Sequence, residues 1–292
     1  YIREGKITLK ELKKAPTERA IVIKEERHRK EPVLTAVNLW FTYPNGVVAL
    51  RGVSLQLYEG ELVGLIGQNG SGKTTLALNL VGALKPTNID AKIIVCGKDI
   101  REIDDMERIQ LINYVFQNPD NQLFSTKVLD EVMFALKMIG MSEDEIKRRV
   151  NEAIDTLGLR EHINRHIIDL TKDLKTLTAL ASIFVLKPRI LIIDEPTGGL
   201  DRKSSHKLMK SLISLRDQGH TIVIITHDMK LVYEYCDRVV VMSDGRILLD
   251  GTPRQVFSKV DILKQAFIRP PQITELAHNL SEYGVPKDVY MV

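Results

Sequence analysis

"GQNGSGKT", residues 67 to 74, is the stretch of this 292-residue sequence that most strongly indicates its fold. It fits the pattern G-x-x-x-x-G-K-[ST], with the strand-like segment "ELVGLIG" (61–67) before it and the helix-like segment "KTTLALNLVGAL" (73–84) after it. Glycines let backbone N–H groups close around phosphate oxygens, and the N-terminus of the following helix adds positive potential. The stretch therefore predicts a strand, a phosphate-binding loop and a helix in succession.

The side chains of this loop have separate expected roles. Lys73 is expected to reach the terminal phosphates of a nucleotide, and the hydroxyl of Thr74 is expected to ligate Mg²⁺. A chance glycine turn is the alternative interpretation, but the strand before the loop and the helix after it disfavour that alternative. The candidate nucleotide-binding residues are Asn69, Gly70, Ser71, Gly72, Lys73, Thr74 and Thr75.

Apolar segments alternate with helical ones from position 33 onward. Further strands are expected in 91–97, 111–116, 189–194 and 221–226, and the unalternating, β-branched last two fit strands buried on both faces of a mostly parallel sheet. Between about 126 and 180 helical patterns replace the strands. There Ser142 and Glu145 fit a capping box, and Gly158 fits a helix stop. The chain is therefore predicted to be an α/β protein with a helical insert.

Two carboxylates follow the strand "RILIID" at 189–194. Asp194 and Glu195 stand at its C-terminal end, where open α/β sheets place their chemistry. Asp194 suits the coordination shell of Mg²⁺, and Glu195 suits a general base that activates water. In the alternative interpretation both acids are only solvated loop residues.

Composition excludes several classes of protein. The content of 44% hydrophobic and 27% charged residues is ordinary for a globular chain, and no apolar run reaches the roughly 18 to 20 residues that span a bilayer. Cys96 and Cys236 stand far apart with no metal-binding spacing, so both are expected to be small core residues in a reducing compartment. A net charge of +3 is too small to favour a nucleic-acid partner.

The first 31 residues differ from the rest. They hold ten Lys and Arg against six Glu, a balance of +4, and the sequence starts at Tyr1. We expect 1–31 to be a charged arm or a linker between two halves of a longer polypeptide. A trimmed chain is the equally weighted alternative.

The order of these motifs resembles the ATP-binding subunits of ABC transporters, over about 33–251. The resemblance implies a P-loop NTPase with a RecA-like core, a mostly parallel sheet, a helical signature subdomain near 118–181 and an antiparallel β portion toward the N-terminus. It implies an ATPase domain at 32–251, an accessory helical segment at 252–292, and ATP and Mg²⁺ as cofactors.

The same resemblance assigns roles to single residues. Tyr43 matches the aromatic residue that stacks on adenine, although a plain core tyrosine is the alternative. Gln117 matches the Q-loop glutamine, which senses Mg²⁺ and the attacking water and couples to a membrane partner. Asp201 matches the D-loop, and His227 matches the switch histidine at the γ-phosphate. The implied catalytic residues are Glu195, His227 and Gln117, and the implied metal ligands are Thr74, Gln117 and Asp194.

Two segments are similar to a narrower group. "FQNPDNQLF" (116–124) and "IRPPQITELA" (268–277) resemble the ATPases of energy-coupling-factor and of cobalt or nickel importers. This implies uptake of a vitamin or a transition metal, a transmembrane scaffold, substrate-binding membrane subunits, and a peripheral position on the cytoplasmic face of the membrane. Two alternatives remain, a soluble ABC ATPase without a transporter and a regulatory module that holds ATP with little hydrolysis.

The family's signature, Leu-Ser-Gly-Gly-Gln, is degenerate here. "LTKDL" (170–174) keeps Leu170, but Lys172 and Asp173 replace the two glycines, while "ALAS" (179–182) stays in register. Side chains then stand where backbone must approach a phosphate, and the Asp173 carboxylate would repel it. The resemblance thus implies an asymmetric dimer, or a tandem fusion, whose second ATPase subunit or half carries an intact signature.

Overall fold

A seven-stranded sheet carries the predicted phosphate site. The computed structural model describes residues 21–22, 31–272 and 274–275 of the chain. The five strands from β10 to β7 run parallel, whereas β11 pairs with β10 in the antiparallel sense. In spatial order the strands are β1 (Ile21–Val22), β11 (Arg246–Gly251), β10 (Arg238–Ser243), β4 (Leu62–Gly67), β9 (Thr221–Ile225), β8 (Ile190–Asp194) and β7 (Ile112–Val115).

The central strands are buried on both faces, as their unalternating composition predicts. Every residue of β4, β8 and β9 is buried. Because successive side chains in a strand point to opposite faces, Leu191 and Ile193 of β8 enter one hydrophobic cluster while Ile190 and Ile192 enter another. The sheet therefore separates two hydrophobic cores. Close packing on both faces holds the C-terminal ends of these strands in fixed positions.

An antiparallel sheet and helix α1 (Lys73–Leu80) cover one face of the large sheet. The small sheet has the order β3 (Val48–Tyr58), β2 (Pro32–Thr42), β5 (Lys92–Val95) and β6 (Lys98–Asp99). The predicted strands at 61–67, 91–97, 111–116, 189–194 and 221–226 are all present. The predicted antiparallel β portion toward the N-terminus is confirmed as well.

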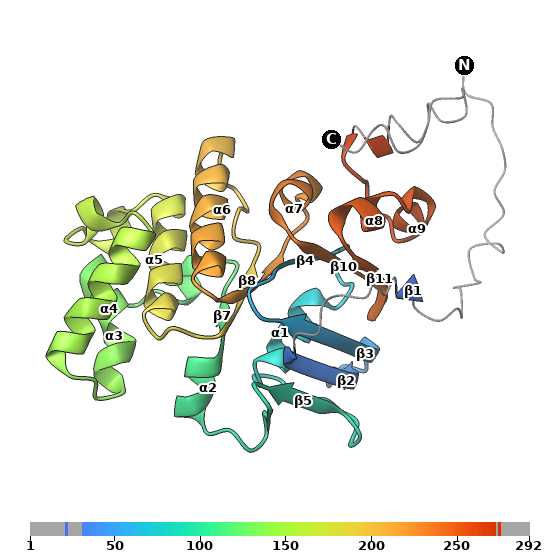
Figure 1. The fold of residues 1–292 in the computed structure, drawn as a ribbon, viewed down its shortest axis with the longest axis horizontal. Coiled ribbons are helices and arrows are strands. Elements are labelled where there is room, and N and C mark those ends of the chain that lie inside the picture. The colour runs from blue at the N-terminus through green and yellow to red at the C-terminus, as the bar shows by residue number, and fades with distance from the viewer. Residues whose placement is uncertain (1–20, 23–30, 273, 276–292) are drawn as a thin grey trace.

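Helices pack on the other face, and those of the predicted insert gather at one end of the molecule (Figure 1). The helices of the insert are α3 (Val128–Met138), α4 (Glu143–Thr156) and α5 (Lys172–Phe184), with 3₁₀ turns at Pro119–Asn121, Arg160–His162 and Ile167–Asp169. The remaining helices up to β10 are α2 (Asp105–Leu111), α6 (Arg202–Asp217) and α7 (Met229–Tyr235).

One detail of the helical prediction is wrong. Ser142 is the N-cap of α4, but its side chain accepts no capping hydrogen bond, so the predicted capping box does not form. Two other acids, Glu143 and Asp144, stand in the first turn together with Glu145, and they favour the helix start through its macrodipole. Gly158 does follow the helix end, with φ of +65°.

The C-terminal part begins with a capping box that forms. Thr252 caps α8 (Pro253–Phe257) by accepting from the backbone of Gln255, whose side chain accepts from the backbone of Thr252. Helix α9 (Val260–Gln265) follows, and both helices lie at the end of the molecule opposite the insert (Figure 1).

Within the predicted N-terminal arm, β1 pairs in parallel with β11. The rest of that arm and the end of the predicted accessory segment lie outside the described residues. No helix in the described part is long and apolar enough to cross a membrane.

Candidate nucleotide and metal site

The loop between β4 and α1 has the backbone that the glycine pattern predicts. Gly72 adopts φ of +98°, and a Cβ atom there would lie 2.5 Å from the carbonyl oxygen of Ala49, so only glycine fits. The Ser71 N–H donates to the carbonyl oxygen of Gln68 at 3.1 Å, which closes the turn. The buried hydroxyl of Ser71 has no hydrogen-bond partner in the described structure.

The ammonium of Lys73 lies folded against the loop that precedes it. Nζ donates to the carbonyl oxygens of Gly67 and Gln68, both at 2.8 Å. Burial lowers the pKa of Lys73, while the charges of Glu195 and Asp194 act in the opposite direction. Since an ammonium has three donors and the loop takes two, one donor is left for a bound anion.

Asp194 and Thr74, two of the expected metal ligands, are in direct contact. The Thr74 hydroxyl donates to Oδ2 of Asp194 at 2.8 Å, across the space between the start of α1 and the end of β8. Asp194 is only 5% exposed, and the hydroxyl of Tyr114 donates to the same oxygen at 2.6 Å. The carboxylate is therefore held by two hydroxyl donors from different elements.

Glu195 and His227 form the second half of the site. Nδ1 of His227 lies 2.9 Å from Oε1 of Glu195, while the buried Oε2 has no partner in the described structure. Glu195 adopts φ of +45°, a conformation that non-glycine residues rarely take. Two backbone bonds hold it there, from the Glu195 N–H to the carbonyl oxygen of Ile225 at 2.8 Å and from the Gly198 N–H to that of Glu195 at 3.0 Å. Such backbone strain clusters at functional sites.

The residues present fit a magnesium ion. Mg²⁺ takes oxygen ligands and is usually bound by one or two protein groups together with phosphates and water. The Thr74 hydroxyl and the Asp194 carboxylate are such a pair, and Glu195, whose Oε2 has no partner in the described structure, directly follows Asp194 in the sequence. No cluster of three or more His, Cys, Asp or Glu suited to a metal occurs within the described residues. The described residues therefore form no metal site whose ligands all come from the protein.

The match to known proteins agrees with this geometry. A family model described as ABC transporter matches residues 50–198, which include the P-loop and both carboxylates. The chain belongs to the ABC transporter family of ATPases.

Similar proteins indicate which type of ABC ATPase this chain is. The energy-coupling factor transporter ATP-binding protein EcfA of Methanocaldococcus jannaschii is 37% identical over 253 residues, covering 86% of this chain and 90% of that protein. A relative from Caldanaerobacter subterraneus is 38% identical over 257 residues, but the chain spans only 45% of its length. A similar solved structure is that of cbiO1 from Clostridium perfringens, described as part of the ABC transporter complex cbiONQ. It has a TM-score of 0.74 and 36% sequence identity, and the match covers 85% of this chain and 100% of the cbiO1 chain.

These matches confirm three predictions made from the sequence. The chain is an ATPase of the ABC family, it is of the energy-coupling-factor type, and it has the P-loop α/β fold. A nucleotide-free ATP-binding cassette at 24% identity and a TM-score of 0.71 supports the fold alone. The roles of single residues remain predictions.

The residues that the family resemblance added lie in the following places. Tyr43 is half-buried, with its ring edge-on to Phe41 and its hydroxyl 3.0 Å from Oγ1 of Thr75, so it adjoins the P-loop helix. Gln117 is exposed, two residues beyond the end of β7. Asp201 caps α6 by accepting from the Ser204 N–H at 2.7 Å, which gives it a structural function as well.

The segment that the resemblance predicts to be a degenerate signature lies at the start of α5. Thr171 is the N-cap but makes no side-chain cap bond, and Asp173 lies in the first turn. The Lys172 ammonium donates to the carbonyl oxygen of Gly198, in the loop that follows Glu195. Sequence reasoning assigned Lys172 only a steric effect and missed this bond within the chain.

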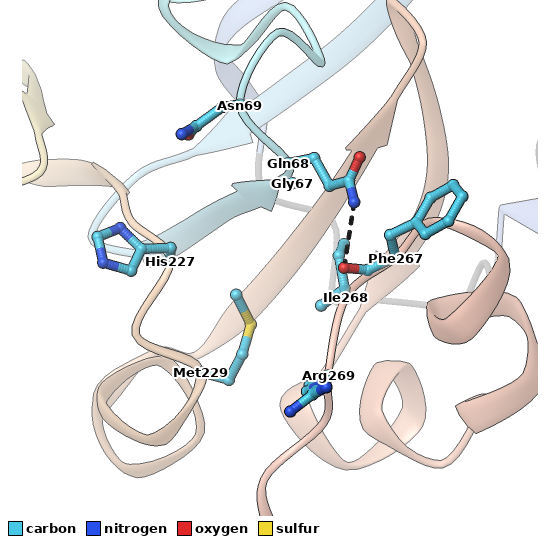
Figure 2. Close-up of a pocket in the computed structure, with 8 residues that line it drawn as sticks. All are labelled: Gly67, Gln68, Asn69, His227, Met229, Phe267, Ile268 and Arg269. Atoms are coloured by element: carbon cyan, nitrogen blue, oxygen red, sulfur yellow. Dashed lines mark hydrogen bonds between the residues drawn. The ribbon is translucent and has the colours of Figure 1, made fainter. Parts of the chain in front are cut away.

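The C-terminal segment contributes to the site, which sequence reasoning also missed. A pocket of about 380 Å³ is lined by the P-loop segment Gly67–Asn69, by His227 and Met229, and by the segment Phe267–Arg269 (Figure 2). The Gln68 side chain donates to the carbonyl oxygen of Phe267 at 3.4 Å. The accessory segment therefore lies directly beside the phosphate loop. The only sequence signal was the "IRPP" motif, which carries no spatial information by itself.

Proposed function

We propose that this chain binds and hydrolyses ATP to power a membrane importer of the energy-coupling-factor type, which takes up a vitamin or a transition metal. The observation that carries the proposal is the contact of the P-loop hydroxyl of Thr74 with the Asp194 carboxylate, beside the Glu195–His227 pair. The names of the related EcfA and cbiO1 proteins support the importer part.

In this proposal the P-loop amides and the remaining donor of Lys73 bind the β- and γ-phosphates. Thr74 and Asp194 would hold Mg²⁺, with Gln117 as a further ligand, and the ion would neutralise charge on the phosphates. The free oxygen of Glu195 accepts a proton from the attacking water. His227 fixes the orientation of Glu195 by its contact with Oε1.

Tyr43 would complete the nucleotide site through the adenine base. Its hydroxyl contacts Thr75 of the P-loop helix, and an aromatic face attracts a nucleobase of any kind. Because its hydroxyl is tied to Thr75, the ring has a fixed position before any nucleotide binds.

The membrane partner would contact the insert near the Q-loop. Phe124 and Phe134 pack edge-on with ring centroids 4.6 Å apart, yet they are 65% and 42% exposed, and Met138, one turn beyond Phe134 on α3, is 68% exposed. Exposed apolar groups that gather in this way mark interaction surfaces. We assign this apolar surface (Phe124, Phe134 and Met138) to a transmembrane scaffold that also carries the substrate-binding subunits, so the ATPase would lie on the cytoplasmic face of the membrane.

A second ATPase subunit or half would supply an intact signature. Lys172 and Asp173 carry side chains where two glycines are expected, and the Asp173 carboxylate lies in the first turn of α5. Negative charge favours the N-terminus of the helix but repels the phosphate that this helix would face. ATP on this chain would be hydrolysed against the partner's signature, and ATP facing Thr171–Leu174 would turn over slowly.

The test is Mg²⁺-dependent ATPase activity of the purified chain, alone and after co-purification with its membrane complex. We expect ATP binding by the chain alone and strong hydrolysis only in the complex. Failure to bind ATP would exclude the proposal. ATP binding with the same slow hydrolysis in the intact complex would favour a regulatory module, and purification without membrane subunits would favour a non-transport ATPase.

A further inference from the structure

We infer that Tyr114 is a positioning residue that holds the metal-binding carboxylate of Asp194 and links it to the protein surface at Phe116. This inference rests on the proposed function, because it concerns the same metal site. Tyr114 lies in β7, next to β8, and its register partner is Ile192, two residues before Asp194. The neighbouring strand thus brings a phenol to the end of β8.

The hydrogen bonds define what Tyr114 does. Its hydroxyl donates to Oδ2 of Asp194 at 2.6 Å, and the Thr74 hydroxyl donates to the same atom at 2.8 Å. Bonds to an ionised acceptor are stronger than neutral ones, and two donors from separate elements restrict rotation of the carboxylate. Thr74 is itself a candidate metal ligand, so its hydroxyl has a second task. Tyr114 has no such competing task and can hold Asp194 throughout.

The second link runs to the surface. The rings of Tyr114 and Phe116 pack edge-on, with centroids 5.1 Å apart and an interplanar angle of 90°. Phe116 is 46% exposed, whereas Val115 between them is 1% exposed. Residues two apart lie on the same side of an extended chain, so the two rings form a continuous contact from the surface to Asp194. Phe116 also stands directly before Gln117, at the start of the segment that leads to the apolar surface.

Tyr114→Phe removes the hydroxyl and keeps the ring, so it tests the hydrogen bond alone. We expect ATP affinity measured in EDTA to stay unchanged. The Mg²⁺ concentration at half-saturation, measured by titrating Mg²⁺ into the full-length chain with a non-hydrolysable ATP analogue, should rise about tenfold, the effect of one hydrogen bond to a charged group. Mn²⁺ binding followed by paramagnetic resonance should weaken by a similar factor.

Tyr58→Phe is the matched control. It removes a hydroxyl that donates to Gln56 Oε1 at 3.1 Å in the antiparallel sheet, away from the metal site, and it should leave the Mg²⁺ titration unchanged. Phe116→Ala should shift the Mg²⁺ midpoint in the same direction as Tyr114→Phe but less, because the Tyr114 ring loses a packing partner while keeping its hydrogen bond.

The outcomes separate this inference from the proposed function. If Tyr114→Phe leaves the Mg²⁺ midpoint at the wild-type value while the wild-type chain needs Mg²⁺ for tight binding, Tyr114 does not position Asp194 and the inference is wrong. An unchanged midpoint for Phe116→Ala alone overturns the link to the surface. If the wild-type chain binds no ATP at all, the proposed function fails, and this inference, which rests on it, fails with it. A lowered ATP affinity in EDTA for Tyr114→Phe would indicate a merely structural role and would also overturn the inference.

Discussion

Nδ1 of His227 lies 2.9 Å from Oε1 of Glu195, although 32 positions separate the two residues in the chain. Their loops follow β8 and β9, which are parallel neighbours, and the Glu195 N–H donates to the carbonyl oxygen of Ile225 at the end of β9. His227 therefore engages one carboxylate oxygen while the other, Oε2, stays buried without a described partner. A carboxylate with one oxygen oriented and one free is suited to accept a proton from water.

Glu195→Gln tests this assignment. Glutamine keeps the size of the side chain and its contact with His227 but removes the base, so ATP should still bind while turnover in the complex falls by about 10²- to 10⁴-fold. Steady-state ATPase and nucleotide titration of the same preparation measure both effects. His227→Ala should lower turnover as well, because Glu195 loses the group that orients it. Wild-type turnover of the Glu195→Gln variant would show that another residue is the base.

Lys73→Ala should abolish measurable ATP binding. The substitution removes the only ammonium that lies folded on the P-loop carbonyls, among the described residues, and with it the cation for the terminal phosphates. Isothermal titration with Mg²⁺-ATP is the measurement. Lys85→Ala is the matched control, since Lys85 is exposed beyond the end of α1 and should leave affinity unchanged. Equal affinities of the two variants would contradict the P-loop assignment.

Tyr43→Ala should weaken ATP binding by about 1 to 3 kcal/mol, the range for stacking of a base on an aromatic side chain. Tyr43→Phe keeps the ring but frees Thr75 from its 3.0 Å contact, so it separates stacking from the hydrogen bond. A loss in Tyr43→Phe as large as in Tyr43→Ala would assign the effect to Thr75 and not to adenine.

The site could be predicted from the sequence wherever a local motif carries the chemistry. The glycine spacing of residues 67–74 fixes a turn that only glycine allows, and two buried strands deliver Asp194 and His227 to one edge of the sheet. The burial of the central strands on both faces could also be predicted, because β-branched runs without polar alternation are typical of strands that are covered on both sides.

Contacts between distant segments could not be predicted in this way. Tyr114 reads as an ordinary strand residue, and only the pairing of β7 with β8 brings its hydroxyl to Asp194. The Lys172 bond to Gly198 and the Gln68 bond to Phe267 depend on how loops of separate elements meet. At Ser142 the sequence spacing fits a capping box, but the box does not form, and the Glu145 side chain that it requires accepts from Arg148 and Arg149 instead.

The free energy of unfolding should depend on the buried ion pair between Arg238 and Asp250. Arg238 is 6% exposed at its side chain and bonds both oxygens of Asp250 at 2.5 Å and Oε1 of Glu61 at 3.0 Å. Asp250→Ala leaves the guanidinium short of a partner and should lower the free energy of unfolding by about 3 kcal/mol or more, as for other broken buried pairs. Urea denaturation measures it. Glu59→Ala, which breaks the half-exposed pair with Arg189, should change it by less than about 1 kcal/mol. Equal losses would contradict the burial argument.

The first turn of α5 gives the last prediction. Leu174 is 8% exposed and packs in the large core, so replacing it by the glutamine of an intact signature would bury an amide. A restored variant should therefore keep Leu174 and combine Thr171→Ser with Lys172→Gly and Asp173→Gly. These changes remove two side chains and one negative charge from the N-terminus of the helix, and they also release Gly198 from Lys172.

Purified alone, the wild-type chain should bind ATP and hydrolyse it slowly, because in the proposed function a homodimer would have two degenerate signatures. The restored chain should hydrolyse ATP about 10²-fold faster alone, the effect of recovering preorganised donors. In the membrane complex the gain should be much smaller, since in the proposed asymmetric dimer the partner's intact signature would already act there. Lys172→Met is the control for the lost bond to Gly198, and it should give no gain because the Asp173 charge remains. The deciding measurement is steady-state ATPase of wild-type, restored and control chains, each alone and in the complex. Fast hydrolysis by the wild-type chain alone, or no gain on restoration, would contradict the asymmetric dimer.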